Sequence, residues 1–283
     1  MAQKIKILVT GASGVLGRAV VNELVGAGFA VRQGVRDLKK ARSGVEAIRF
    51  DYDEPATIKP ALEGVHGMCL IAPPLDPTAP TKLKPAIDAA KQAAVGHVVF
   101  ISAFGANHNE QAPLRIVEHQ VMGSGQAYTI LRPNFFMENF SDGFLAAPLK
   151  AQGAIYLAAG DGKTSFISVA DIARVVVESF RRALAGKELD LTGPEALDHA
   201  EVAKILSEVL GREIKYHAIS EQEMLEGARR AGMPESAVQY LAALYGAVRA
   251  GYAAAVTPEV EKITGRKPVS FREFAQANAA KWK

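Results

Sequence analysis

Hydrophobic residues along the first half of the chain, up to Pro133, follow two alternating patterns. Short runs rich in apolar and β-branched residues predict buried strands at 5–11, 29–36, 67–74, 97–105 and 127–133. Between them, apolar residues recur every three or four positions, which predicts helices at 15–28, 55–65, 81–96 and 113–125. Because apolar strands alternating with helices are typical of sheets covered on both faces, we expect an α/β fold: a Rossmann doubly wound parallel sheet with helices on both faces.

The pattern changes after Pro133, where an aromatic and polar segment is predicted to form a loop. A strand followed by a helix with Asp171 in its first turn is predicted over 164–184, and a strand, turn and helix over 187–211. From Gly193 onward the chain is mostly helical, with a short strand near 213–219. We therefore expect a sheet domain over 1–190, with the loop region 133–152 contributing to the substrate side, and a smaller, mostly helical substrate domain over 191–283.

Composition narrows the possible functions. The 283 residues are 49% hydrophobic and 22% charged, with a net charge of +3, so nothing favours a nucleic-acid partner. The single cysteine, Cys69, excludes an intramolecular disulfide and, with no signal peptide expected at the N-terminus, favours a cytoplasmic protein. The alanine-rich stretch 237–256 contains Gln239 and Arg249, so we expect a helix packed on protein rather than a membrane span.

The segment "VTGASGVLG" at 9–17 places three glycines between a predicted strand and a predicted helix. Glycine permits a positive φ angle and a close approach of the backbone to a pyrophosphate, which then meets free N–H groups at the start of the helix. This context predicts a dinucleotide site; the alternative is a tight turn without a ligand. The expected contacts are Gly11, Ala12, Ser13, Gly14, Val15 and Leu16.

The end of the second predicted strand distinguishes NADPH from NADH. An NAD site places a carboxylate there to accept from the ribose hydroxyls, but this chain has Val35, followed by Arg36. A guanidinium suits the 2′-phosphate of NADPH, so we expect NADPH to be preferred over NADH. Lys39 and Lys40 are interpreted as part of a solvated face, and Asp37 beside Arg36 weakens the prediction.

Other cofactor contacts are expected where the later strands end, because ligands of open α/β sheets bind at the carboxyl ends of the strands. Asp51, with Tyr52 beside it, is a candidate for the adenine end, although such a carboxylate more often belongs to a solvated turn. The segments after the next two strands are expected to border the cofactor through Ala72, Pro73, Pro74, Ser102, Ala103 and Phe104.

Taken together, six motifs resemble the atypical short-chain dehydrogenases of the NmrA-like type, and among them the bacterial reductases of triphenylmethane dyes, quinones and, without flavin, azo dyes. The motifs are "TGASGVLG", "VR", "ISAFGA", "YTILRPNFFMEN", "FISVADIA" and "LTGPEALDHAEVA". The resemblance covers nearly the whole chain. It implies an NADP(H) site that continues into the loop Pro133, Asn134, Phe135 and Phe136, expected beside the nicotinamide.

The wider superfamily uses a Tyr-x-x-x-Lys pair for proton transfer, and this chain has no such pair. Leu114 stands at the position of the tyrosine and Glu118 at that of the lysine, while Tyr128 and Arg132 have the spacing but lie on a predicted strand. Carbonyl and alcohol reactions need a positioned acid. A conjugated acceptor depends less on such an acid, because the cofactor supplies the hydride and the protein supplies the orientation of the reactants.

Few residues stand out as candidates for catalysis. His108 and Glu118 are weak candidates; an exposed loop histidine and a helix-surface carboxylate are the alternatives. Phe136, Met137 and Tyr245 are candidates for substrate contact, although Tyr245 and Tyr252, seven residues apart on one predicted helix face, are more typical of a packing or dimer surface. No metal-ligand spacing is present.

Two functions remain open. The first is an NADPH-dependent oxidoreductase, without flavin or metal, that transfers hydride directly to a quinone, azo dye or triphenylmethane dye. The second is a non-catalytic NADP(H)-binding redox sensor of the NmrA type. In either case we expect a monomer or homodimer that has no membrane partner.

Overall fold

The computed structural model describes residues 5–283. The prediction that the N-terminal segment is not a signal peptide also involves residues 1–4, which lie outside the described range. The chain divides into two compact units. Unit 1 comprises Met1–Pro133 and Val169–Asp190, and unit 2 comprises Asn134–Ser168 and Leu191–Lys283. The functional division into an NADP-binding domain and a substrate domain with a boundary at 190 stays a prediction.

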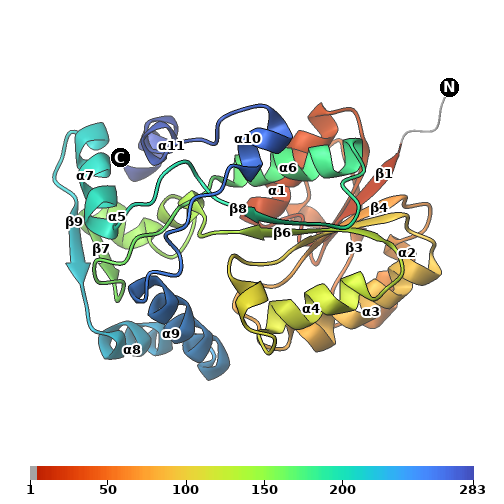
Figure 1. Ribbon diagram of the computed structural model, residues 1–283, viewed down its shortest axis with the longest axis horizontal. Helices are drawn as coiled ribbons and strands as arrows, with labels where there is room; N and C mark the ends of the chain where they lie inside the picture. The colour runs from red at the N-terminus through yellow and green to blue at the C-terminus, as the bar shows by residue number, and fades with distance from the viewer. Residues whose placement is uncertain (1–4) are drawn as a thin grey trace. The chain divides into compact units, whose positions relative to one another are not determined.

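Unit 1 is built on a seven-stranded sheet (Figure 1). Its strands, in the spatial order β3-β2-β1-β4-β5-β6-β8, are Glu46–Arg49, Ala30–Val35, Lys6–Val9, Gly67–Ile71, His97–Ile101, Ala127–Pro133 and Lys187–Leu191. Neighbouring strands from β3 through β6 run parallel. The order reverses direction at β1, as in a doubly wound sheet, which confirms the predicted fold class.

Helices cover both faces of this sheet (Figure 1). The helices α1 and α6 pack against each other on one face, and α2, α3 and α4 lie on the other. Their bounds are Val15–Gly26, Ile58–Ala61, Ala79–Gln92, Pro113–Met122 and, for α6, Val169–Arg181. On the second face Leu83 and Val117 join Met68, Val98 and Ile130 of the strands in one buried core. These buried residues belong to the apolar patterns from which the strands and helices were predicted.

Unit 2 combines a two-stranded parallel sheet with six helices among its described residues (Figure 1). The strands β7 and β9 are Ala154–Leu157 and Lys215–Ala218. The helices α5 and α7 to α11 are Ala146–Gln152, His199–Leu210, Glu221–Arg230, Glu235–Arg249, Glu259–Thr264 and Phe271–Asn278. The rings of Phe140, Phe166, His199 and Phe271 pack together in its core, with centroids 5.2–6.1 Å apart. The Trp282 indole N–H donates to the Phe140 carbonyl at 2.7 Å.

Five short 3-10 helices complete the description. The helices η1 to η5 are Leu38–Lys40, Pro55–Thr57, Ala106–His108, Met137–Phe140 and Ala279–Trp282. The helix predicted over 55–65 therefore consists of η2 followed by the single turn of α2.

Two predictions from the sequence were wrong in detail. The strand expected at the start of 164–184 is absent, since residues there form only isolated bridges, Thr164 with Leu197 and Ile167 with Phe136. The helix expected over 237–256 ends at Arg249, so Tyr245 and Tyr252 do not share a helix face. Tyr245 is 3% exposed and Tyr252 is 76% exposed. Among residues 5–283 no helix is long and apolar enough to span a membrane.

Candidate functional site

The turn between β1 and α1 depends on glycine at two positions. Gly11 has a φ angle of +60°, which a side chain rarely allows, and a Cβ on Gly17 would lie 2.8 Å from the Ala12 Cα. Gly14 caps α1 through its backbone, with no side-chain cap and no acidic residue in the first turn. The first N–H groups of α1 are therefore available to an anion. The turn has the backbone geometry of the predicted pyrophosphate site, and ligand binding there stays a prediction.

Arg36 follows β2 at the same edge of the sheet, beyond the buried Val35. Its side chain is exposed, and within residues 5–283 its guanidinium makes no hydrogen bond or ion pair. Two of the neighbouring charged side chains are engaged elsewhere: Asp37 accepts from the Lys39 backbone N–H at 3.0 Å, and Arg42 donates to Asn22 at 2.9 Å. Arg36 is therefore free to bind a ligand phosphate.

The predicted adenine-side residues are held in local hydrogen bonds. The Tyr52 hydroxyl lies 2.9 Å from both the Thr10 hydroxyl and the Ile71 carbonyl, which links the ends of β1 and β4. Burial raises the pKa of Tyr52, so its hydroxyl stays neutral. The Asp51 carboxylate accepts from the Asp53 N–H at 3.1 Å. Both residues shape the strand ends, and contact with a cofactor there stays a prediction.

The segments after β4 and β5 lie at the same edge. Ala72 and Pro73 are half-buried and Pro74 is exposed. The Ser102 N–H donates to the Leu131 carbonyl at 2.8 Å, and the Phe104 N–H donates to the Pro133 carbonyl at 3.0 Å. These bonds extend the β5–β6 pairing to the end of both strands. They bring the segment Ser102, Ala103 and Phe104 beside Pro133, and contact of these residues with a cofactor stays a prediction.

Glu118 is the centre of a buried charge network rather than a surface carboxylate. It is fully buried and accepts from Ser102 at 2.5 Å, from Arg115 at 2.9 Å, and from two nitrogens of Arg132 at 2.8 and 2.7 Å. Burial alone would raise its pKa, but the hydrogen bonds from Arg132, Ser102 and Arg115 hold that pKa below its ordinary value. Glu118 is therefore ionised at neutral pH and cannot donate a proton.

The pairing of Glu118 with Arg132 could not be predicted from the sequence. Glu118 lies on α4 and Arg132 on β6, fourteen residues apart, and Arg132 also pairs with Glu188 of β8. No periodicity links such positions. His108, the other catalytic candidate, is an exposed residue of η3. Its role stays a prediction.

The aromatic loop that follows β6 belongs to unit 2. The two Asn134 side-chain N–H groups donate to the Ser165 hydroxyl and the Ala253 carbonyl, each at 2.8 Å, so this amide fixes the loop. Met137 is fully buried, whereas Phe135 and Phe136 are half-buried. The Phe135 ring lies 5.8 Å from the Tyr245 ring, centroid to centroid. Unit 2 thus brings together two of the residues predicted near the nicotinamide and the substrate.

The helix α9 contains a Tyr-x-x-x-Arg spacing that was not among the sequence predictions. Tyr245 and Arg249 are four residues apart on this helix, one turn from each other. The Arg249 guanidinium donates to the Ala158 carbonyl and pairs with Glu221. Its charge is thus used within unit 2, so the pair does not reproduce the Tyr-x-x-x-Lys arrangement.

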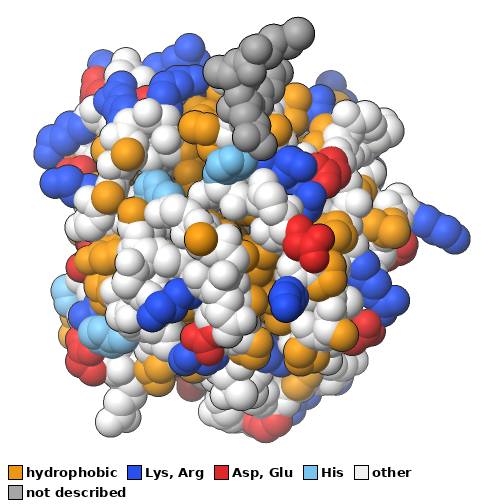
Figure 2. All heavy atoms as spheres, turned by 90° about the vertical axis from the view of Figure 1, so that its right-hand side faces the viewer, with side chains coloured by type: hydrophobic (Ala, Val, Ile, Leu, Met, Phe, Trp, Pro, Cys, Tyr) orange, Lys and Arg blue, Asp and Glu red, His pale blue; other side chains and the backbone are white. Residues whose placement is uncertain are grey.

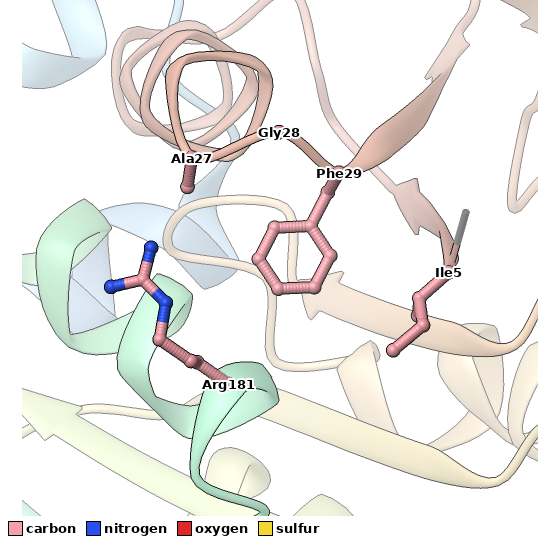
Figure 3. A pocket seen from close by; sticks show the side chains of 5 residues that line it. All are labelled: Ile5, Ala27, Gly28, Phe29 and Arg181. Atoms are coloured by element: carbon pink, nitrogen blue, oxygen red, sulfur yellow. The ribbon is translucent and has the colours of Figure 1, made fainter. Parts of the chain in front are cut away.

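The hollow in Figure 3 belongs to unit 1 and lies where β1 and β2 begin, at the end of these strands opposite the glycine turn and Arg36. Its volume is about 180 Å³, and it is lined by Ile5, Ala27, Gly28, Phe29 and Arg181. Drug-sized ligands occupy pockets of about 300–1,000 Å³, so this hollow is too small for a dinucleotide. On the face shown in Figure 2, acidic and basic side chains are interspersed. In the described part of the chain no group of three His, Cys, Asp or Glu residues could hold a metal ion.

Comparison with known proteins identifies relatives over nearly the full length. The model of the NmrA-like family matches residues 3–275. Prestalk A differentiation protein A of Dictyostelium discoideum is 35% identical, covering 96% of this chain and 92% of that protein. The NAD(P)H azoreductase of Xenophilus azovorans is 36% identical, covering 97% and 98%.

Solved structures are also similar to this chain over nearly its full length. The triphenylmethane reductase of a Citrobacter species superposes with a TM-score of 0.84 at 26% identity, covering 97% of this chain and 99% of that one. An NADPH-dependent quinone oxidoreductase of Escherichia coli, solved in complex with NADPH, superposes with a TM-score of 0.83 at 26% identity, covering 96% and 99%.

Proposed function

This chain belongs to the NmrA-like family, and on that premise we propose that it is an NADPH-dependent oxidoreductase that reduces conjugated electron acceptors by direct hydride transfer. The acceptor class is a quinone, an azo dye or a triphenylmethane dye. The names of its relatives support an NAD(P)H-dependent oxidoreductase in general, since they include an NAD(P)H azoreductase and an NADPH-dependent quinone oxidoreductase. The choice of acceptor and of NADPH rests on the residues of this chain.

The observation that carries the proposal is the pairing of an intact glycine turn with an unengaged Arg36. In this assignment the backbone N–H groups between Gly11 and Leu16 that make no other hydrogen bond bind the pyrophosphate, and the Arg36 guanidinium binds the 2′-phosphate. The Ala12 and Gly14 N–H groups instead shape the turn, since they donate to the Gly34 and Gly11 carbonyls at 3.2 and 3.0 Å. No carboxylate follows β2 at position 35 or 36 to accept from a 2′-hydroxyl. NADPH, when bound, supplies a hydride, and the residues around it bind and orient the reactants.

The choice of acceptor class rests on the absence of an available proton donor among Ser102, Leu114 and Glu118 of unit 1. The Ser102 hydroxyl donates to Glu118, so its single proton is not available to polarise a substrate carbonyl. The tyrosine and lysine of the usual proton-transfer pair are replaced by Leu114 and Glu118. A substrate that accepts hydride without prior polarisation fits this arrangement better than a simple ketone or alcohol.

Two measurements test the proposal. NADPH oxidation is followed with a panel of quinones, azo dyes and triphenylmethane dyes, and NADPH and NADH binding are compared by calorimetry. We expect turnover with at least one conjugated acceptor, no turnover with simple ketones, and no flavin absorbance in the purified protein. Tight NADPH binding without oxidation by any acceptor would instead support the redox sensor, and failure to bind either dinucleotide would exclude both functions.

A further inference from the structure

Lys82 of α3 bridges two loops at the carboxyl edge of the unit 1 sheet. Its ammonium nitrogen lies 3.3 Å from the Asp53 carboxylate, in the loop after β3, and 3.0 Å from the Asp76 carboxylate, in the loop after β4. The interactions with Asp76 and Asp53 raise the pKa of Lys82, so its side chain is charged at neutral pH. Both loops contain residues that the sequence predicts to contact the cofactor, so Lys82 joins two parts of one predicted site.

The loop after β4 is held in a strained conformation. Leu75 has a φ angle of +52°, in the left-handed region that residues other than glycine rarely adopt. Asp76, the next residue, accepts from the Thr78 N–H at 2.8 Å and from the Thr78 hydroxyl at 2.6 Å, and it pairs with Lys82. Burial alone would raise the pKa of Asp76, but the interactions with Thr78 and Lys82 lower it, so the carboxylate is ionised. Strained residues persist only where their surroundings hold them, and they are frequent where a protein holds a ligand.

The beginning of this loop lies beside the glycine turn of the same unit. The Thr10 hydroxyl accepts from the Ile71 N–H at 2.8 Å, and a Cβ placed on Gly11 would lie 3.8 Å from the Ile71 Cβ. The segment 72–75 is therefore fixed at both ends, by Ile71 at the glycine turn and by Asp76 at the ammonium group of α3. A pyrophosphate bound at the turn would place the adjoining part of the dinucleotide next to this segment.

We propose that Lys82 is a positioning residue of the dinucleotide site: it holds the loops after β3 and β4 in the arrangement that binds the adenosine end of NADPH or NADH. This inference rests on the proposed function, because it needs a dinucleotide at the glycine turn. Loops that are ordered before binding lower the entropy cost of association, so the bridge strengthens binding without contact between Lys82 and the cofactor. The hydride leaves from the nicotinamide, at the other end of the dinucleotide, so the bridge affects affinity and not the chemical step.

The test compares Lys82→Met with Lys84→Met on the same helix. Lys84 pairs at 2.6 Å with Asp88, one turn further along α3, so this control removes an ion pair that joins no loop. In Lys82→Met we expect the Kd of NADPH and the Kd of NADH, measured by calorimetry, to rise by the same factor of about 3 to 10. The KM for NADPH is expected to rise with them, while kcat stays within about twofold of the wild-type value. Lys84→Met is expected to match the wild type in each of these quantities.

Lys82→Arg tests whether the positive charge at this position is what matters. A guanidinium can bind carboxylates as an ammonium group does, so this variant is expected to keep the wild-type affinity for both dinucleotides. Unchanged affinity in Lys82→Met would overturn the positioning role, as would equal losses in Lys82→Met and Lys84→Met. A loss confined to NADPH would also overturn it, since Lys82 would then act on the 2′-phosphate. Failure of the wild type to bind either dinucleotide would instead overturn the proposed function itself.

Discussion

The polar groups at the carboxyl edge of unit 1 and those around the aromatic loop of unit 2 are used in different ways. In unit 1 the charges of Glu118, Arg115 and Arg132 bind one another, and Arg36 is left unengaged. In unit 2 the Asn134 amide fixes the loop through the Ser165 hydroxyl and the Ala253 carbonyl. In both units these bonds stabilise the fold, and in unit 1 the unengaged Arg36 is the group that we assign to a ligand.

The largest effect is expected where the unit 1 network is broken. Glu118→Gln removes the buried carboxylate that binds Arg132 and Arg115 and leaves the buried Arg132 only the more exposed Glu188 and Asp190 as partners. We expect a loss of about 3–5 kcal/mol in the free energy of unfolding, measured with urea. Glu208→Gln is the control, because its pair with Arg272 is exposed and worth at most about 1 kcal/mol. Equal losses in the two variants would show that the Glu118 network does not stabilise unit 1.

A smaller loss of stability, with a large loss of binding, is expected at the glycine turn. The Cβ of Gly17→Ala would lie 2.8 Å from the Ala12 Cα, so the turn must shift, at about 1–3 kcal/mol of stability. NADPH affinity should then fall at least about 100-fold, which corresponds to about 2.7 kcal/mol.

Gly26→Ala, on the same helix, is the matched control for this turn. A Cβ there meets no atom within 4 Å, so this variant should bind NADPH as the wild type does. Retained binding in Gly17→Ala would show that the turn does not hold the pyrophosphate.

A fall in pH should reduce the stability of unit 2 before that of unit 1. Burial lowers the pKa of His199 in unit 2 from 6.5 to about 4. The neutral form is therefore favoured by folding, and its contribution is complete above pH 6.5 and lost as the pH falls toward 4. Glu118, whose pKa is lowered from 4.5, contributes stability above that value and loses it only at more acidic pH.

Hydrogen exchange at pH 7.5 and pH 5 measures this difference. We expect α7, which begins at His199, to lose protection at pH 5 while α4, which carries Glu118, keeps it. His199→Phe keeps an aromatic ring in the core and should remove the difference between the two pH values. Equal protection of α7 at both pH values in the wild type would contradict the prediction.

The smallest effect is expected at Arg36. Arg36→Ala should weaken NADPH binding about 10-fold and leave NADH binding unchanged, because only the 2′-phosphate contact is removed. Lys40→Ala, a nearby exposed cation, is the control and should have little effect on either dinucleotide. A matching loss of NADH affinity in Arg36→Ala would assign Arg36 to the fold rather than to the phosphate.

Much of unit 1 could be predicted from the sequence. The apolar runs predicted β1, β2, β4, β5 and β6, because strands buried on both faces have little polar content. Unit 2 was harder to predict. The segment 164–168 was expected to begin with a strand but forms only single bridges, and α9 ends three residues before Tyr252 although the alanine-rich pattern continues.

The sequence by itself determined the alternation of strands and helices, the glycine turn and Arg36 beyond β2, because each depends on neighbouring residues and local backbone geometry. Only the tertiary structure decided which polar groups are paired. Glu118 and Arg132 meet because α4 packs beside β6, and Asn134 reaches the Ala253 carbonyl across 119 residues. A hydrogen bond requires two groups about 3 Å apart, and the spacing of residues along a chain does not encode that distance.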